Sequence, residues 1–285
     1  MSANRAVSKP TEELFRVCET GDVQAVSRLL QDPEVDINWQ CSQSYGATPL
    51  IAAISHGHQE IVQILLNADA ELGVVKTPDR NSPLHEAAFA GDPNIMQFVL
   101  NKVLEKSGDN AADLLNLQNQ VRTSAYLGDT LLNFYVLRLK FGNTPLHNAA
   151  RTGSPGCVSN LLQAGAMPSI KNVVSELVSS CSLIPCTESY LTMLQNGSIP
   201  LHHACYSETP NLEVVRLLVE AGSDVNALDE QGYSPLIVAA KKNQTEVIEY
   251  LRKHGADTTL KNSFGEDALH FAELRNNTGA IQLLE

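Results

Sequence analysis

Apolar residues recur every three or four positions in many short stretches of this chain, and a polar or glycine-containing turn follows each stretch. Ile61, Ile64 and Leu65 have this spacing in one stretch, and Val214 and Leu218 begin and end another. The spacing predicts short amphipathic helices rather than strands. No apolar run approaches the ~18 residues that a membrane-spanning helix needs, so we expect no membrane partner.

A three-residue motif with a central proline sets the period of this pattern. The proline stands at positions 49, 83, 145, 200 and 235, and a degraded copy of the motif is centred on Ala268. The steps between copies are 34, 62, 55, 35 and 33 residues. Three steps match a period of about 33 residues, and the other two are longer by 29 and 22 residues. A fixed period of this length is typical of an array in which each unit buries surface against its neighbours.

The motif contains the residues that begin a helix. Its first position is Thr or Ser in four copies, and these hydroxyls can accept a backbone N–H at the start of a helix. The proline then takes the first helical position, where it lacks only a donor that the helix does not use. Gly57, Gly91 and Gly153 follow where the helix should end. Each unit is therefore predicted to contain two helices.

This pattern resembles the ankyrin-repeat family, whose signature T-P-L-H-x-A is complete at 144–149 and nearly complete at 82–87 and 199–204. The resemblance implies an all-α repeat solenoid of helix–turn–helix units joined by β-hairpin loops. We expect one domain over 11–285, with seven units, two insertions in the hairpin fingers and a flexible N-terminus at 1–10. The expected ranges are 11–44 for the N-terminal cap, 45–78, 79–118, 141–172, 196–228 and 229–262 for internal units, 263–285 for the C-terminal cap, and about 119–140 and 173–195 for the insertions.

The two insertions are rich in apolar residues, as at Leu131, Leu132 and Phe134, which argues against floppy tails. Either each insertion packs a short helix onto the array, or it contacts a partner. The stretch Tyr126–Leu132 is similar to the signature helix of ribonuclease III. However, Ala125 replaces the expected acid, and Asp129 alone cannot make a metal site. An enzyme built from the insertions is therefore the least favoured of three functions.

Charge narrows the class of partner. The chain has 32 acidic and 20 basic residues, which gives a net charge of −12. Residues 1–100 hold 13 of the acidic residues and 6 of the basic ones. An acidic surface repels phosphate backbones, so we expect no nucleic acid. The expected partner is another protein with a basic or mixed basic and apolar segment. The protein is expected to be monomeric alone and cytoplasmic, with the nucleus as the alternative, because no apolar leader follows Met1.

Motifs for catalysis are missing from the sequence. It has no phosphate-binding glycine loop, no H-E-x-x-H and no C-x-x-C, so we expect no enzyme, no cofactor and no metal. The six cysteines are expected to be free thiols; the alternative for Cys181 and Cys186, which four residues separate, is a disulfide. The histidines at the fourth motif position are expected to form hydrogen bonds between neighbouring hairpins; they are His85, His147, His202 and His270.

The resemblance also implies a binding surface on the concave side, formed by hairpin tips and the ends of the first helices. The positions carried over are Tyr45, Ser55, His56, Phe89, Phe141, Arg151, Tyr206, Tyr233, Lys241, Phe264 and Arg275. Six of the fifteen aromatic residues fall in this set, and aromatic residues and Arg are frequent in interface hot spots. We expect the rings of Phe89, Phe141, Tyr206 and Tyr233 to form an exposed row. The alternative is that such rings pack on the adjoining finger. From the resemblance, we expect the chain to be a binding module or scaffold, or the recognition arm of a larger adaptor.

Overall fold

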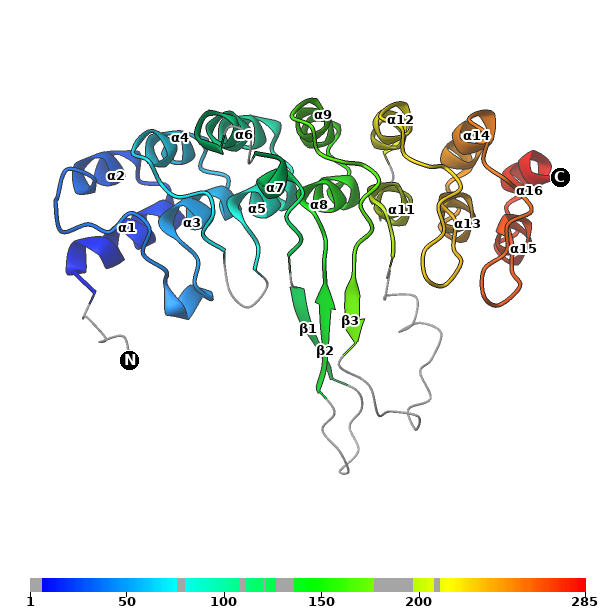
Figure 1. Cartoon of the computed structure of the whole chain (residues 1–285), viewed down its shortest axis with the longest axis horizontal. Helices are drawn as coiled ribbons and strands as arrows, with labels where there is room; N and C mark the ends of the chain where they lie inside the picture. Colours follow the sequence, from blue (N-terminus) through cyan, green and yellow to red (C-terminus); the bar gives the residue numbers. More distant parts are fainter. Residues whose placement is uncertain are drawn as a thin grey trace.

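The computed structural model describes residues 7–75, 80–107, 111–119, 121–126, 136–176, 197–207 and 211–285. Its helices lie in two rows that run side by side along the molecule (Figure 1). The first row, here called the inner helices, lies next to the loops and contains α1 (Lys9–Thr20), α3 (Pro49–Ser55), α5 (Pro83–Ala90), α8 (Pro145–Thr152), α11 (Pro200–Tyr206), α13 (Pro235–Lys241) and α15 (Ala268–Leu274).

The second row, here called the outer helices, covers the inner helices on the side away from the loops (Figure 1). It contains α2 (Val23–Leu29), α4 (Gln59–Asn67), α6 (Pro93–Ser107), α9 (Pro155–Gln163), α12 (Leu212–Glu220), α14 (Thr245–Lys253) and α16 (Thr278–Leu284). Each inner helix packs against the outer helix that follows it and against the next inner helix. The predicted helical solenoid is therefore confirmed, while the division into units stays a prediction.

The helix ends form as the motif predicts. The hydroxyl of Thr48 accepts a hydrogen bond from the N–H of Ile51 at 3.3 Å, and the hydroxyl of Ser234 accepts one from Ile237 at 3.2 Å. These hydroxyls pair backbone donors that the first turn of a helix leaves free. Gly91 ends α5 with a φ of +72°, a left-handed conformation that glycine adopts without strain.

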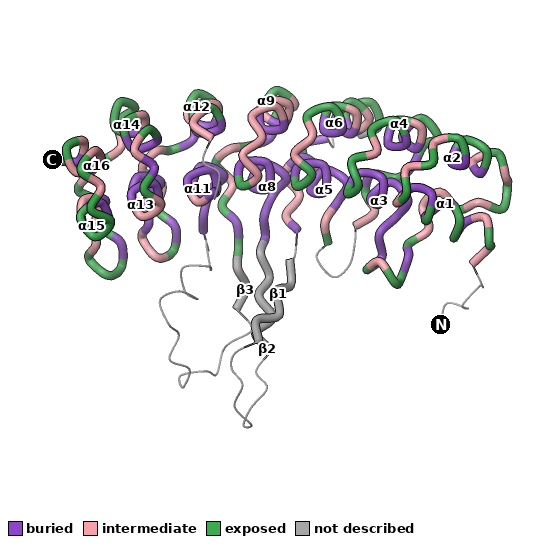
Figure 2. Tube along the Cα trace, turned by 180° about the vertical axis from the view of Figure 1, so that it is seen from behind, coloured by how far each residue is buried: buried purple, intermediate pink, exposed green. Residues whose placement is uncertain are grey.

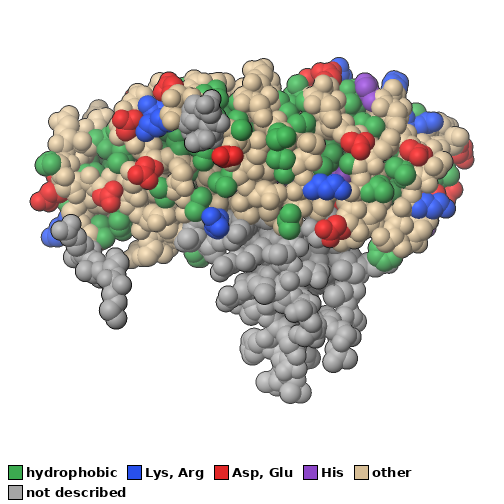
Figure 3. All heavy atoms as spheres, in the orientation of Figure 1, with side chains coloured by type: hydrophobic (Ala, Val, Ile, Leu, Met, Phe, Trp, Pro, Cys, Tyr) green, Lys and Arg blue, Asp and Glu red, His purple; other side chains and the backbone are tan. Residues whose placement is uncertain are grey.

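Burial follows the two-row arrangement: the facing sides of the rows are buried and the outward sides of the outer helices are exposed (Figure 2). On the face drawn in Figure 3, acidic and basic side chains are interspersed. The net charge of −12 therefore does not gather into one patch on that face. Many of these charges neutralise one another locally; Asp69, for example, lies 3.0 Å from the ammonium group of Lys106.

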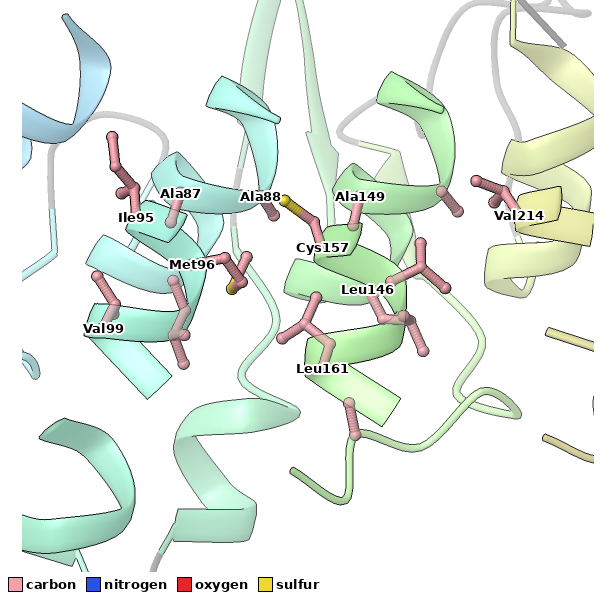
Figure 4. Close-up of a cluster of buried hydrophobic side chains, with 14 of the residues drawn as sticks. Ala87, Ala88, Ile95, Met96, Val99, Leu146, Ala149, Cys157, Leu161 and Val214 are labelled. Atoms are coloured by element: carbon pink, nitrogen blue, oxygen red, sulfur yellow. The ribbon is translucent and has the colours of Figure 1, made fainter. Parts of the chain in front are cut away.

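Small residues between the inner helices allow them to approach closely. Ala87 and Ala88 of α5 and Ala149 of α8 are fully buried, and Figure 4 shows them in one cluster with Met96 and Leu161 from the outer helices. A longer side chain at any of the three alanines would force the helices apart, since protein interiors are close-packed. The small motif residues thus set the distance between neighbouring units.

Three buried histidines each link one unit to the next, as expected. The Nε2 of His85 donates to the carbonyl of Asn143, that of His147 to Ser198, and that of His202 to Tyr233, each at 3.0 Å. His270, in α15, differs from these three. Its side chain is exposed and lies 3.6 Å from Glu266, so the expectation of a linking hydrogen bond is wrong for this residue.

The lengthened loops form a small antiparallel sheet. Its strands are β1 (Val121–Tyr126), β2 (Val136–Phe141) and β3 (Val174–Glu176), in the order β1-β2-β3. The sheet extends away from the inner helices near α8 (Figure 1). The described residues of the first insertion therefore form the strands β1 and β2 and not a helix packed onto the array. β1 pairs with β2, and β2 pairs with β3 of the next loop.

The unit before the first insertion has a long outer helix, α6, which continues to Ser107, and a short helix, α7 (Ala111–Leu115), that was not anticipated from the sequence. The residues 127–135 and 177–196 lie outside the described residues. This includes Asp129, the apolar residues of the first insertion named above, and the cysteine pair Cys181 and Cys186.

Candidate functional site

Three of the predicted site rings are exposed. The exposed fraction is 66 % for Tyr45, 56 % for Phe89 and 58 % for Phe264. Tyr45 and Phe264 lie in loops just before a glycine, and Phe89 lies near the end of the inner helix α5. These rings are therefore available to contact another molecule.

The other predicted rings do not form the expected exposed row. Tyr233 is only 4 % exposed, because its ring packs against Phe271 of the next inner helix, with 6.2 Å between centroids. The expectation of an exposed ring is wrong for Tyr233. Tyr206 is half-buried, and burial raises the pKa of its hydroxyl. The side chain of Phe141 lies outside the described part of the chain, although its backbone ends strand β2.

Cations lie over three of the predicted rings, and for Phe89 and Tyr206 the cation comes from the unit that follows. The guanidinium of Arg151 lies 5.3 Å from the centroid of Phe89, and the ammonium of Lys242 lies 5.5 Å from the centroid of Tyr206. Lys241 lies 4.8 Å from the ring of Tyr233. Such contacts contribute about 0.5–1 kcal/mol at exposed sites. We call the set of Phe89, Arg151, Tyr206, Lys241 and Lys242 the cation–ring row.

The sequence identified four members of the cation–ring row but missed Lys242. Its position beside Lys241, directly after the last residue of α13, was the signal that pointed to it. The pairing of Phe89 with Arg151 and of Tyr206 with Lys242 was also missed, because these partners lie in different units of the sequence.

The polar candidate Ser55, at the C-terminal end of α3, holds a buried carboxylate of α5. Ser55 donates to Oε2 of Glu86 at 3.0 Å, and Asn81 donates to Oε1 at 2.9 Å. Glu86 is only 6 % exposed and was not singled out in the sequence. His56 is exposed, with its Nδ1 2.9 Å from the carbonyl of Ala52.

Below the cation–ring row lies a buried pair of imidazoles. His147 and His203 contact each other edge to face, with 5.0 Å between ring centroids. Burial holds the pKa of His203 well below its ordinary value, and the nearby His147 and Arg151 lower it further. His203 is therefore neutral at neutral pH. The adjacent His202 donates to the carbonyl of Tyr233 instead, so the two histidines serve different contacts.

The described residues offer no chemistry for catalysis by a metal. Among them, no group of three or more His, Cys, Asp or Glu side chains is arranged to hold a metal ion. The cysteines 18, 41, 157 and 205 are buried and free, and burial raises the pKa of Cys205 to about 12. Within the same part of the chain, no helix has the length and apolar character to cross a bilayer.

Comparison with known proteins agrees with this architecture. A family model of ankyrin repeats matches in three copies, at residues 14–112, 106–227 and 169–262. The chain belongs to the ankyrin-repeat family. Repeats of this family are generally protein–protein interaction modules, and domains of this fold are typically not enzymes.

Three curated relatives of this chain are longer than it is. It is 25 % identical over 269 residues to the human transient receptor potential cation channel subfamily A member 1, covering 85 % of the chain and 21 % of the channel. It is 27 % identical over 252 residues to the mouse B-cell lymphoma 3 protein homolog, covering 83 % and 51 %. It is 30 % identical over 207 residues to the human ankyrin repeat and SOCS box protein 16, covering 68 % of the chain and 43 % of that protein. The chain thus spans at most about half the length of these relatives.

Solved ankyrin-repeat structures confirm the fold. The ankyrin repeat domain of human ASB11 superposes with a TM-score of 0.66 at 20 % identity, and 95 % of each chain is covered. The ankyrin repeat domain of Bcl-3 gives a TM-score of 0.63 at 23 % identity, with 95 % of this chain and 96 % of that chain covered. At these identities the likeness shows the fold alone.

Proposed function

We propose that this ankyrin-repeat chain is an interaction module that binds a partner protein through its hairpin loops and the ends of its inner helices. The observation that carries this proposal is Phe89, a ring that is 56 % exposed and held in place by Arg151 of the next unit. An exposed ring fixed in this way contacts a partner without losing much side-chain freedom, and aromatic and Arg side chains dominate interface hot spots.

Tyr45 and Phe264 extend the proposed surface to the hairpin loops near the two ends of the array. We keep the expectation of a basic partner segment for the N-terminal part, because residues 1–100 hold 13 acidic and 6 basic residues. Binding there is expected to weaken as salt rises, since about 0.1 M salt screens charges beyond ~10 Å.

A second reading is that the chain is the recognition arm of a larger adaptor. The observation that favours it is the length of the relatives, of which the chain matches 21 % to 51 % in the channel and the B-cell lymphoma 3 protein. We propose a cytoplasmic or nuclear location for either function, because four described cysteines are free, and reduced thiols are typical of these compartments.

The test compares proteins captured from cell extract by the parent chain, Phe89→Ala and Leu104→Ala, with quantitative mass spectrometry. Leu104 is the control, because its side chain is 46 % exposed on the outer helix α6. Phe89→Ala is expected to reduce capture of the specific partner by about tenfold or more. Its melting temperature should stay nearly unchanged, because exposed substitutions cost about 0.5 kcal/mol or less. If Phe89→Ala captures the same proteins in the same amounts as Leu104→Ala, the proposed surface is wrong.

A further inference from the structure

We infer that the cation–ring row binds an acidic segment of the partner protein that also carries apolar side chains. This inference rests on the proposed function and concerns its C-terminal half. It runs against the net charge of −12, which by itself favours a basic partner throughout.

The first step is the order of the groups in the row. Phe89 lies on α5, Arg151 on α8, Tyr206 on α11 and Lys241 on α13, and these four inner helices pack against one another in that order. Rings and cations therefore alternate along the array. A bound chain that runs along the inner helices meets an apolar surface and a positive charge in turn.

The second step is the local charge. The inner helices α8, α11, α13 and α15, together with the residue that ends each of them, carry four cations and one carboxylate; these are Arg151, Lys241, Lys242, Arg275 and Glu273. On the outer helices the charges pair along the helix, as Arg216 and Glu213 do at 3.4 Å. Among the described residues, Arg151 and Arg275 have no carboxylate within 4.0 Å. Within the described residues, Arg151 and Arg275 are thus cations without a close carboxylate on the inner helices of an acidic protein.

The third step is what Arg151 still offers to a ligand. Its guanidinium has five N–H donors in a planar fork, a geometry that matches a carboxylate with two parallel hydrogen bonds. Among the described residues it contacts the face of Phe89 and makes no hydrogen bond. A carboxylate on Arg151 would place the neighbouring side chains of the ligand against Phe89 and Tyr206, which favours apolar residues beside the acidic one.

A structural explanation competes with this inference. Arg151 and Lys241 lie in the last turns of their helices, where cations stabilise the helix dipole by about 0.3–1 kcal/mol. That explanation predicts a loss of stability and no effect on binding when the charge is reversed. It does not account for the rings that the cations cover.

The spacing of the row constrains the ligand further. Packed helices lie about 8–10 Å apart, and an extended chain advances about 3.3 Å per residue. From α8 to α13 is two helix steps, so acidic residues that meet Arg151 and Lys241 should be separated by about five or six residues. A ligand of about a dozen residues spans the row.

The experiment selects random peptides of about 16 residues, displayed on phage, against the whole chain, and measures the affinities of the enriched peptides by fluorescence polarisation. We expect enriched peptides with a net negative charge and an aromatic or aliphatic residue beside an acidic one. Arg151→Glu is expected to weaken their binding by about tenfold or more. Arg252→Glu is the control, because it makes the same charge change in the last turn of the outer helix α14 and should change the affinity less than about twofold.

Circular dichroism checks that each variant is folded, and Arg151→Gln, which removes the charge without reversing it, replaces Arg151→Glu if that variant unfolds. Enriched peptides that are basic, or that bind Arg151→Glu and Arg151→Gln as tightly as the parent, would overturn the inference. The proposed function then still stands if Phe89→Ala abolishes their binding. No enrichment at all also overturns the inference, and the capture experiment with Phe89→Ala then decides the proposed function separately.

Discussion

Replacing His147 by alanine tests how the repeats are held together. This imidazole is fully buried, and its two nitrogens join three groups. Nε2 donates to the carbonyl of Ser198 at 3.0 Å, while Nδ1 lies 2.8 Å from the hydroxyl of Thr144 and accepts from its N–H at 3.1 Å. Thr144 begins helix α8 and Ser198 lies just before α11, so one side chain both caps a helix and links two units.

The cost of the substitution follows from what each group loses. The carbonyl of Ser198 keeps a hydrogen bond from the N–H of Asn172 at 2.8 Å, so it loses one of two, a cost of about 0.5–1.5 kcal/mol. The N–H of Thr144 is left buried without its acceptor, which costs about 1–3 kcal/mol. The space left by the ring adds about 1 kcal/mol or more. We therefore expect His147→Ala to lower the free energy of unfolding by about 3–5 kcal/mol.

His270→Ala is the matched control, because His270 holds the same motif position in the last unit but is exposed, with Glu266 3.6 Å away. Its loss is expected to cost about 0.5 kcal/mol or less. Urea unfolding, followed by circular dichroism at pH 7, measures the free energy of unfolding of both variants. The dependence of that free energy on urea concentration is compared with that of the parent chain. If the two variants unfold within about 1 kcal/mol of each other, the buried histidines do not link the units as described.

Three further predictions concern stability. Burial lowers the pKa of His85, His147 and His202 from 6.5 to about 4, so the folded protein keeps them neutral while the unfolded chain takes up protons below about pH 6.5. Their contribution is complete above that pH and is lost as the pH falls towards 4, so the urea midpoint should drop between pH 7 and pH 5; an unchanged midpoint would contradict this. Gly232→Ala should destabilise more than Gly165→Ala, about 2–4 against ~1 kcal/mol, although both residues have positive φ. A Cβ at Gly232 would lie 3.0 Å from the Cα of Asn262, whereas nothing lies within 4 Å at Gly165, so equal drops in melting temperature would count against the close approach. Finally, amide hydrogen exchange should show less protection over 101–195 than over 11–100 and 196–285, because longer loops raise the entropic cost of closing the neighbouring interfaces. Uniform protection would refute that prediction.

The sequence by itself determined the repeating architecture, since the signals that encode it are local. Thr48 and Ser234 cap helices through backbone groups three residues away, and Pro at the next position suits only the first turn. His147 was predicted to link two hairpins because the motif repeats, and each unit meets a neighbour of the same shape. Local chemistry and a fixed period were sufficient for these features.

Only the tertiary structure decided which side chains of the surface are exposed and how their charges are arranged. Tyr233 and Phe264 both lie beside a turn glycine, yet Tyr233 is buried because Phe271 of the next unit covers it, whereas Phe264 lies in the last loop and no described unit covers it. The contact between Phe89 and Arg151 likewise joins two units separated by the first insertion. Exposure and pairing depend on the side chains of the neighbouring unit, which the period places nearby but does not specify.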